Sequence, residues 1–217
     1  MDYLSRPSSL KNNNCLLRLE NAEKRYGRTV VLNIEEFEVE HGSSIALLGE
    51  NGSGKSTFLR ILAGISSLSS GKRHISKKLS DVRITFVPQS GGTYNTLTVQ
   101  ENLDLYARLY GQKMYENPEK EWFIKDYGLD SYLNYPVSEL SGGYQKITAL
   151  ACALSVNPHC LFLDEPFSGL DSDRKQKMSD ALNKTSKQLY FMICTGHTPD
   201  ELPFCTKHHT LTQGNLI

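Results

Sequence analysis

The segment GENGSGKST at residues 49–57 limits the possible folds of this chain more than any other stretch. It fits the pattern G-x-x-x-x-G-K-[ST], follows the apolar run SIALL at 44–48, and precedes a helical pattern over 55–63 that Gly64 ends. Such a loop turns its backbone N–H groups and the positive end of the helix toward a phosphate. We therefore predict a phosphate-binding loop on a parallel α/β sheet.

The polar residues of this loop each have a task in phosphate chemistry. Lys55 would bridge the β- and γ-phosphate oxygens of a nucleoside triphosphate, Ser56 would ligate Mg²⁺, and Thr57 would support the loop. A chance match is the bland alternative, and the strand and helix on either side of the pattern argue against it. The loop alone still allows kinases, GTPases and many ATPases.

A pair of carboxylates distinguishes among these enzyme classes. In the run CLFLDEP at 160–166, residues 160–163 are an apolar strand that delivers Asp164 and Glu165 at its C-terminal end, where parallel sheets bind ligands. Asp164 would hold the magnesium ion, and Glu165, facing the opposite way, would position or deprotonate an attacking water. Alone, the pair could be an ordinary strand end before Pro166. With the loop upstream, it favours hydrolysis of the γ-phosphate.

The rest of the chain alternates between strand and helix patterns. Apolar or alternating runs predict further strands at residues 15–21, 30–39, 82–87, 189–194 and 209–211. We find no strand between residues 89 and 141, where Thr98 and Glu101 form a capping box. Helices are predicted at 99–110, 119–127, 143–155 and 172–187. The residues from about 90 to 155 are interpreted as a helical lobe inserted in the α/β core.

Composition and charge exclude several classes of protein. Lys plus Arg and Asp plus Glu are equal at 24 each, so the formal net charge is zero and we expect no nucleic-acid partner. The five cysteines lack a CxxC spacing, which indicates reduced core thiols. We find neither a signal-peptide h-region nor a run approaching about 18 apolar residues, so membrane spans are not expected. Residues 1–14 are interpreted as a mobile tail.

The stretch LSGGYQK at 140–146 predicts a second anion site. Its Ser-Gly-Gly turn leads directly into a helical pattern, so the free N–H groups and the positive end of that helix could bind a phosphate without a lysine. The chain therefore carries two half-sites for phosphate, only one of which has a lysine.

Together these motifs resemble the nucleotide-binding subunit of an ATP-binding-cassette (ABC) transporter over residues 15–217. GENGSGKST resembles the family's Walker A loop, CLFLDEP its Walker B strand, LSGGYQK its signature motif and SGLD at 168–171 its D-loop, all in the family's order. Gln89 resembles the Q-loop glutamine, His197 the switch histidine and Tyr26 the adenine-stacking aromatic. The implied fold is a P-loop NTPase of the RecA-like type: a mostly parallel sheet core, an N-terminal antiparallel β subdomain and an inserted helical lobe.

The resemblance implies an ATPase that uses ATP and Mg²⁺. Its catalytic residues would be Lys55, Glu165 and His197, and its metal ligands would be Ser56, Gln89 and Asp164. The nucleotide would be bound by Tyr26, Gly49, Asn51, Gly52, Ser53, Gly54, Lys55, Ser56, Thr57, Gln89, Ser141, Gly142 and Gly143.

The resemblance also implies partners. Two cassettes would dock head to tail, with each ATP between the Walker A loop of one and the signature motif of the other, as a homodimer or with a related cassette. Separate transmembrane permease subunits would couple the ATPase to transport at the cytoplasmic face of a membrane, where this chain would be peripheral. The stretch GGTYNTLTVQENLDLYARLYG resembles cassettes of bacterial exporters. The alternative is a non-transport ABC ATPase that acts on a nucleic-acid or ribosomal partner.

Two positions depart from the family's pattern. Tyr144 replaces the glutamine of LSGGQ, with Gln145 one place later, which puts the γ-phosphate geometry in question. Gly196 stands where a small hydroxyl residue is common, and we expect this change to loosen the switch around His197.

Overall fold

The larger of two sheets forms the centre of the protein in the computed structural model, which describes residues 14–111 and 123–217. Its strands are β3 (Ser43–Leu48), β5 (Ile84–Val87), β6 (Cys160–Leu163), β7 (Phe191–Gly196), β8 (Lys207–Thr212) and β9 (Asn215–Leu216). They run in the order β5-β6-β7-β3-β8-β9, and every neighbouring pair is parallel except β8 with β9. The predicted mostly parallel core is confirmed.

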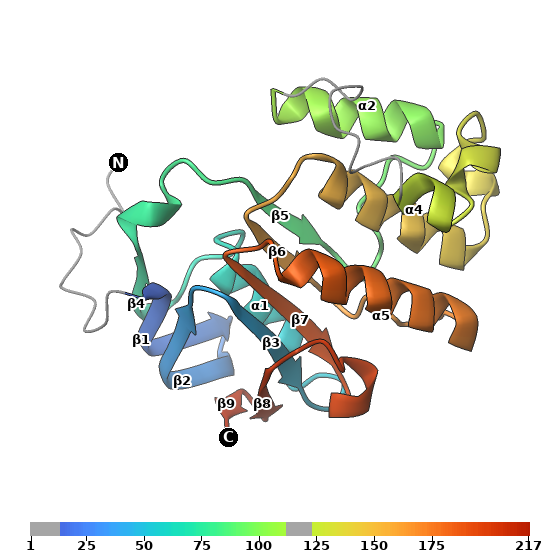
Figure 1. Ribbon diagram of the computed structural model, residues 1–217. Coiled ribbons are helices and arrows are strands. Elements are labelled where there is room, and N and C mark those ends of the chain that lie inside the picture. The colour runs from blue at the N-terminus through green and yellow to red at the C-terminus, as the bar shows by residue number, and fades with distance from the viewer. Residues whose placement is uncertain (1–13, 112–122) are drawn as a thin grey trace.

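A smaller antiparallel sheet lies beside the main one, at the lower left of Figure 1. It contains β1 (Cys15–Tyr26), β2 (Thr29–Glu40) and β4 (Ser70–Ile75) in the order β2-β1-β4, which confirms the N-terminal antiparallel subdomain. The sequence did not predict β4, because SGKRHI is an edge strand with one apolar residue and lacks the apolar alternation of a half-buried strand.

Alternate residues of the central strands belong to two separate cores. Ile45 and Leu47 of β3 pack with β1, β2 and helix α1 (Lys55–Leu62). Ala46 and Leu48, which point to the other face, pack with the helices α2 (Val99–Leu109), α4 (Gly142–Ser155) and α5 (Ser172–Ser186). The sheet is therefore covered on both faces, which explains why SIALL is apolar throughout.

The helices α2 and α4 form a lobe at the upper right of Figure 1. Helix α2 packs on α4, and α4 packs on β5. The predicted capping box opens α2: Glu101 N donates to Thr98 Oγ1 at 3.1 Å, and Thr98 N donates to Glu101 Oε2 at 2.8 Å. Of the helix predicted at 119–127, residues 123–126 are helical and the earlier part lies outside the described residues. The predicted tail also lies outside them, apart from Asn14.

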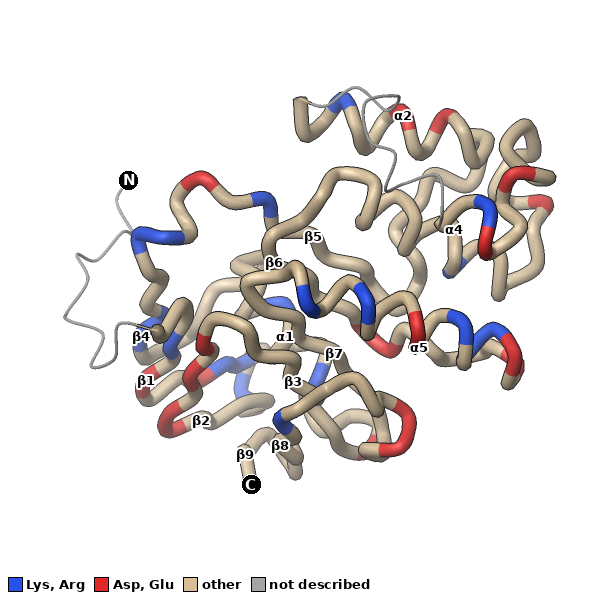
Figure 2. Tube along the Cα trace, viewed as in Figure 1, with Lys and Arg blue, Asp and Glu red and all other residues tan. Residues whose placement is uncertain are grey.

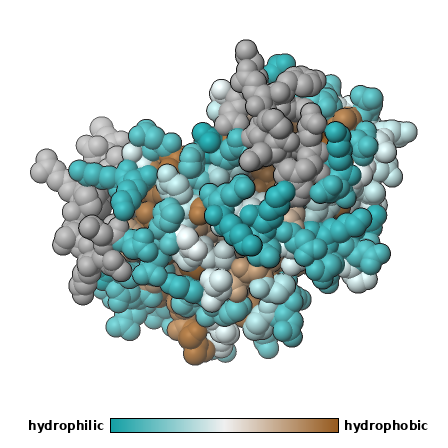
Figure 3. All heavy atoms as spheres, in the orientation of Figure 1, coloured by the Kyte–Doolittle hydropathy of each residue, from teal (hydrophilic) through white to brown (hydrophobic). Residues whose placement is uncertain are grey.

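The surface of the described residues is mixed in charge and mostly hydrophilic. Figure 2 shows Lys, Arg, Asp and Glu interspersed along the antiparallel sheet and the helices, with no large field of one sign, whereas the strands β3, β5, β6 and β7 carry no charged residue. On the face in Figure 3, an apolar patch lies at the lower edge, near the C-terminal end of the chain, where Ile217 is 80% exposed. Of the helices in the described ranges, none has the length and apolarity to cross a bilayer.

Candidate functional site

The Walker A loop connects β3 to α1, as predicted, and its surroundings require two of its glycines. Gly49 has a φ of 148°, and a Cβ at this position would lie 2.4 Å from the carbonyl oxygen of Leu211. Gly54 has a φ of 104°, and its Cβ would lie 2.9 Å from Leu32 Cδ2. Because β8 and β2 press on the loop at these two points, its backbone is held in one arrangement.

The Lys55 ammonium is held by the loop that precedes it. Its side chain is 4% exposed, and Nζ donates to the carbonyl oxygens of Gly49 at 2.7 Å and Glu50 at 3.0 Å. Nζ also lies 3.9 Å from Glu165 Oε1. An ammonium has three donors, so one remains for a phosphate oxygen.

An open hollow of about 390 Å³ lies over the loop. Its lining consists of Val31, Asn51, Gly52, Gly54, Lys55, Ser56, Thr57, Gln89 and Glu165. The Walker A loop, the Q-loop glutamine and a Walker B carboxylate therefore meet at one hollow. Tyr26 does not line it: the residue ends β1, is 54% exposed, and has Lys24 Nζ 5.1 Å from its ring centroid.

Asp164 is buried at the end of β6, directly behind the Walker A loop. Its Oδ1 accepts from Ser56 Oγ at 2.9 Å and from Thr195 Oγ1 at 2.8 Å. Its Oδ2 is buried and has no hydrogen-bond partner among the described residues. A buried carboxylate oxygen normally has a partner. Oxygen ligands from one carboxylate and one hydroxyl suit Mg²⁺, which takes its other ligands from phosphates and water.

Glu165 is bound by polar groups from several elements. Its carboxylate accepts from Gln89 Nε2 at 2.7 Å, and Oε1 lies 3.8 Å from His197 Nε2. Its N–H donates to Thr195 Oγ1 at 2.8 Å. Its φ of 47° is unusual for a residue with a side chain, and such backbone strain persists where the surroundings fix it. These contacts therefore fix the Glu165 carboxylate at the edge of the hollow over the Walker A loop, the phosphate hollow.

Two residues that no sequence motif singled out contact Asp164 and Glu165. Thr195 of β7 contacts both Asp164 and Glu165, and its place two residues before His197, at the end of a parallel strand, was the available signal. Lys146 of α4 donates from Nζ to the carbonyl oxygen of Glu165 at 3.3 Å. Lys146 lies inside the signature motif, but the sequence does not show that helix α4 brings it to the end of β6.

The residues around Gly196 and His197 are tightly packed, although the glycine at 196 predicted a loose switch. A Cβ at Gly196 would lie 2.9 Å from Leu202 Cδ1 and 3.3 Å from Glu201 Oε2. Glu201 Oε2 also accepts from the backbone N–H of His197 at 2.8 Å. In this chain, the space of a small hydroxyl side chain is therefore filled by Leu202.

The signature turn begins α4, as predicted. Ser141 is the N-cap residue, its hydroxyl makes no capping hydrogen bond, and both Ser141 and Gly142 are exposed. The first N–H groups of α4 and the positive end of its dipole therefore lie at an exposed surface. Ser141, Gly142 and Gly143 do not line the hollow of the Walker A loop. The two half-sites for phosphate are separate within one chain.

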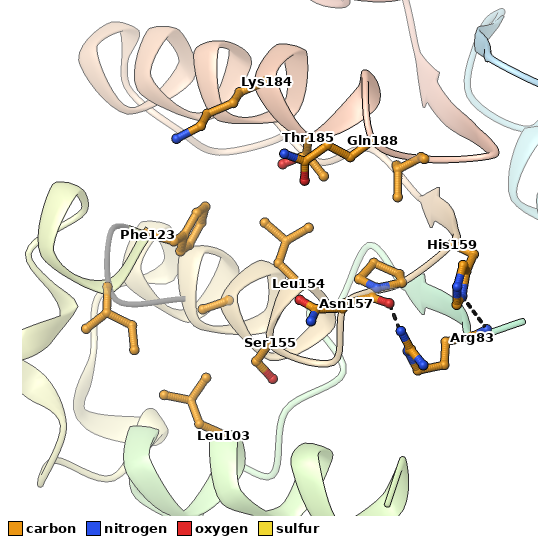
Figure 4. A pocket seen from close by; sticks show the side chains of 14 residues that line it. Arg83, Leu103, Phe123, Leu154, Ser155, Asn157, His159, Lys184, Thr185 and Gln188 are labelled. Carbon is orange, nitrogen blue, oxygen red and sulfur yellow. Dashed lines mark hydrogen bonds between the residues drawn. The ribbon is translucent and has the colours of Figure 1, made fainter. Parts of the chain in front are cut away.

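A second hollow of about 350 Å³ lies between α5 and the helical lobe (Figure 4). Leu103, Phe123 and Leu154 project into it from the lobe, and Lys184, Thr185 and Gln188 face them from α5. At one end, Arg83 N donates to His159 Nδ1 at 3.0 Å and Arg83 Nε donates to the carbonyl oxygen of Asn157 at 2.8 Å. None of the predicted site residues lines this hollow.

Comparison with known proteins identifies the family. The profile of the ABC transporter family matches residues 32–168. The Nod factor export ATP-binding protein I of Sinorhizobium fredii is 32% identical over 210 residues, which cover 93% of this chain and 61% of that protein. The Fe(3+) ions import ATP-binding protein FbpC of Fusobacterium nucleatum is 31% identical over 182 residues, which cover 80% of this chain and 48% of that protein. Both relatives extend well beyond the part that this chain matches.

The fold is also that of solved cassettes. A dimeric structure of the ATP-binding cassette MJ0796, in a post-hydrolysis state bound to ADP and Pi, matches with a TM-score of 0.79 at 25% identity, and the match covers 93% of this chain and 96% of that one. The profile match, the shared fold and the Walker geometry agree. The chain belongs to the ABC transporter family and carries the ATP-binding ATPase domain of that family.

Proposed function

We propose that this chain binds and hydrolyses ATP as the motor subunit of a transporter, and that it pairs with a second cassette around two ATP molecules. The observation that carries the proposal is the convergence on Glu165. Lys55, Gln89 and His197, from three separate segments, lie within 4 Å of its carboxylate at the edge of the phosphate hollow. Such convergence is what hydrolysis of a bound phosphate requires.

The phosphates of ATP bind over the Walker A loop. The loop N–H groups, the start of α1 and the third donor of Lys55 hold the β- and γ-phosphate oxygens. Ser56, the unpartnered Oδ2 of Asp164 and the amide oxygen of Gln89 would hold Mg²⁺. When bound, this ion neutralises charge that develops on the phosphate oxygens. Tyr26 offers an exposed ring face on which the adenine stacks.

Glu165 is the base in this proposal. A water oxygen attacks the γ-phosphorus, its proton passes to the Glu165 carboxylate, and the bond to the β–γ bridging oxygen breaks to leave ADP. Gln89 and His197 orient the carboxylate and the water, since both already lie beside the Glu165 oxygens. Thr195 fixes the backbone of Glu165 and one oxygen of Asp164 together.

The signature turn acts on the nucleotide of another copy. Ser141, Gly142 and Gly143 lie away from the hollow of their own chain, with a free hydroxyl and free helix N–H groups. These groups bind the γ-phosphate held by the partner, so ATP joins two cassettes and its hydrolysis releases them. The dimeric state of the solved cassette MJ0796 supports this arrangement.

Permease chains convert this opening and closing into transport. The relatives are named as ATP-binding proteins of export and import systems, and the export relative matches the larger share of this chain. We therefore propose export, with the chain held peripherally at the cytoplasmic face by separate transmembrane subunits.

Affinity purification from the native cells tests the transport role. The chain is tagged, the membranes are solubilised in mild detergent with ATP, and co-purifying proteins are identified, with an untagged strain as control. We expect a polytopic membrane protein in stoichiometric amount. Recovery only from the soluble fraction, with ribosomal or DNA-bound partners, would contradict the transport role and favour the non-transport alternative.

A further inference from the structure

The residue that departs from the signature pattern, Tyr144, is covered by an arginine from a different helix. The guanidinium carbon of Arg174, in α5, lies 4.8 Å from the centroid of the Tyr144 ring. The aliphatic part of the same side chain covers the turn itself, because a Cβ on Gly143 would lie 3.2 Å from Arg174 Cδ. Arg174 therefore contacts two consecutive residues of the signature motif.

Arg174 is anchored to the end of the D-loop. Its Nη1 forms an ion pair with Asp171, and its backbone N–H donates to Asp171 Oδ1 at 2.9 Å. Asp171 is the N-cap of α5 and the last residue of the SGLD segment. One side chain thus joins the start of α5 to the start of α4.

The Tyr144 ring is also supported from the helical lobe. Tyr132 lies 4.6 Å from it, centroid to centroid, and Tyr132 in turn lies 5.9 Å from Tyr135. A ring with partners on more than one side makes a fixed platform for a guanidinium, which binds the negative face of aromatic rings. Glutamine at position 144 would offer no such face.

We propose that Arg174, seated on Tyr144, is a positioning residue of the signature turn, and that this pair holds the turn in the geometry that binds the partner's γ-phosphate. This proposal rests on the ATP-bridged pairing proposed above. It explains how the signature turn can work without the usual glutamine, because the contact between Arg174 and the Tyr144 ring orders the turn instead.

ATP-driven association of two cassettes tests the contact between Arg174 and Tyr144. These residues lie at the signature turn and do not line the hollow of the Walker A loop. In a Glu165→Gln parent, which we expect to bind ATP without turnover, the dissociation constant of the dimer is measured by sedimentation with saturating ATP. The affinity of the monomer for a fluorescent ATP analogue is measured separately, and thermal unfolding checks that each variant folds. Lys187→Gln is the matched control, since it removes a positive charge from the exposed far end of the same helix.

We expect Arg174→Ala and Tyr144→Leu each to weaken ATP-driven association about tenfold, with the monomer's affinity for the ATP analogue unchanged. Because both changes break one contact, the double variant should be little weaker than either single variant. Tyr144→Phe keeps the ring but removes the hydroxyl, which also interacts with Arg174, so it should fall between the parent and Tyr144→Leu. Arg174→Lys should fall between the parent and Arg174→Ala.

Three results would overturn the inference. Arg174→Ala could associate as tightly as the parent, the two single effects could add in full, or Tyr144→Phe could weaken association as much as Tyr144→Leu. If the Glu165→Gln parent itself does not associate with ATP, the proposed pairing of two cassettes is wrong and the inference falls with it. The first three outcomes leave that pairing intact, so the two failures are distinguishable.

Discussion

At the scale of single residues, the site is organised around the backbone and side chain of Glu165. Its N–H is bound by Thr195, its carbonyl oxygen by Lys146 and its carboxylate by Gln89. A left-handed conformation at φ 47° is held because each of these groups has a partner. The direction of the Glu165 carboxylate is therefore set by Thr195 and Lys146, which do not line the hollow of the Walker A loop, and by Gln89, which does.

Lys146 provides a test of this arrangement. Burial lowers the pKa of its ammonium, and its Nζ bonds to the Glu165 carbonyl oxygen rather than lining the phosphate hollow. We predict that Lys146→Met lowers the turnover number about tenfold while the dissociation constant for ATP is unchanged, and that Lys146→Arg recovers part of the rate. Steady-state phosphate release and ATP titration measure the two quantities. Equal losses in ATP binding and turnover, or no recovery with arginine, would show that Lys146 is merely structural.

Among the helices and strands, the sequence predicted the buried strands well, but it missed strand segments whose side chains are mostly polar and exposed. Strand β6 was predicted at residues 160–163 and found there, because a fully buried parallel strand is a short apolar run. Strand β4 was missed, and β1 continues to Tyr26 beyond its predicted end at residue 21. Strand β4 is an edge strand with mostly polar side chains, and residues 22–26 of β1 are also mostly polar, so neither stretch shows an apolar pattern in the sequence. Asn21, with a φ of 46°, marks an irregularity in β1 that a pattern of side chains does not reveal.

The start of β6 is tied to the start of β5 through His159, which makes this junction sensitive to acid. Nδ1 of His159 accepts from Arg83 N, and burial together with Arg83 lowers the pKa of the imidazole below its usual 6.5 (Figure 4). Between the folded and unfolded pKa values, the unfolded chain binds more protons than the folded chain. The free energy of unfolding therefore falls as the pH drops below about 6.5.

We predict that His159→Asn reduces this acid sensitivity, because its amide oxygen can accept from Arg83 N without titrating. Denaturant unfolding at about pH 7 and about pH 5 measures the loss of stability for each protein. The exposed His208→Asn serves as control, since it removes an imidazole that does not accept from Arg83 N. An equal loss of stability in parent and His159→Asn would contradict the prediction.

At the scale of the whole molecule, the sequence predicted the members of the site better than their grouping. Gln89, Asp164, Glu165 and His197 come from distant segments and meet because the carboxyl ends of β5, β6 and β7 share one edge of the sheet. The signature turn does not join them within the chain. No pattern in one chain can give the geometry of a site that a second copy completes, and that completion stays a prediction.

Complementation between two inactive variants tests whether each site is built from two copies of the chain. Glu165→Gln keeps the signature turn and ATP binding but lacks the base, whereas Ser141→Arg keeps the base but blocks the signature turn. Phosphate release is measured for each variant alone and for an equal mixture. We predict no turnover from either alone and about a quarter of the parent activity in the mixture, since random pairing makes half the dimers mixed, each with one intact site of two. A mixture as inactive as its components, or full activity of Ser141→Arg alone, would contradict a site shared between two copies.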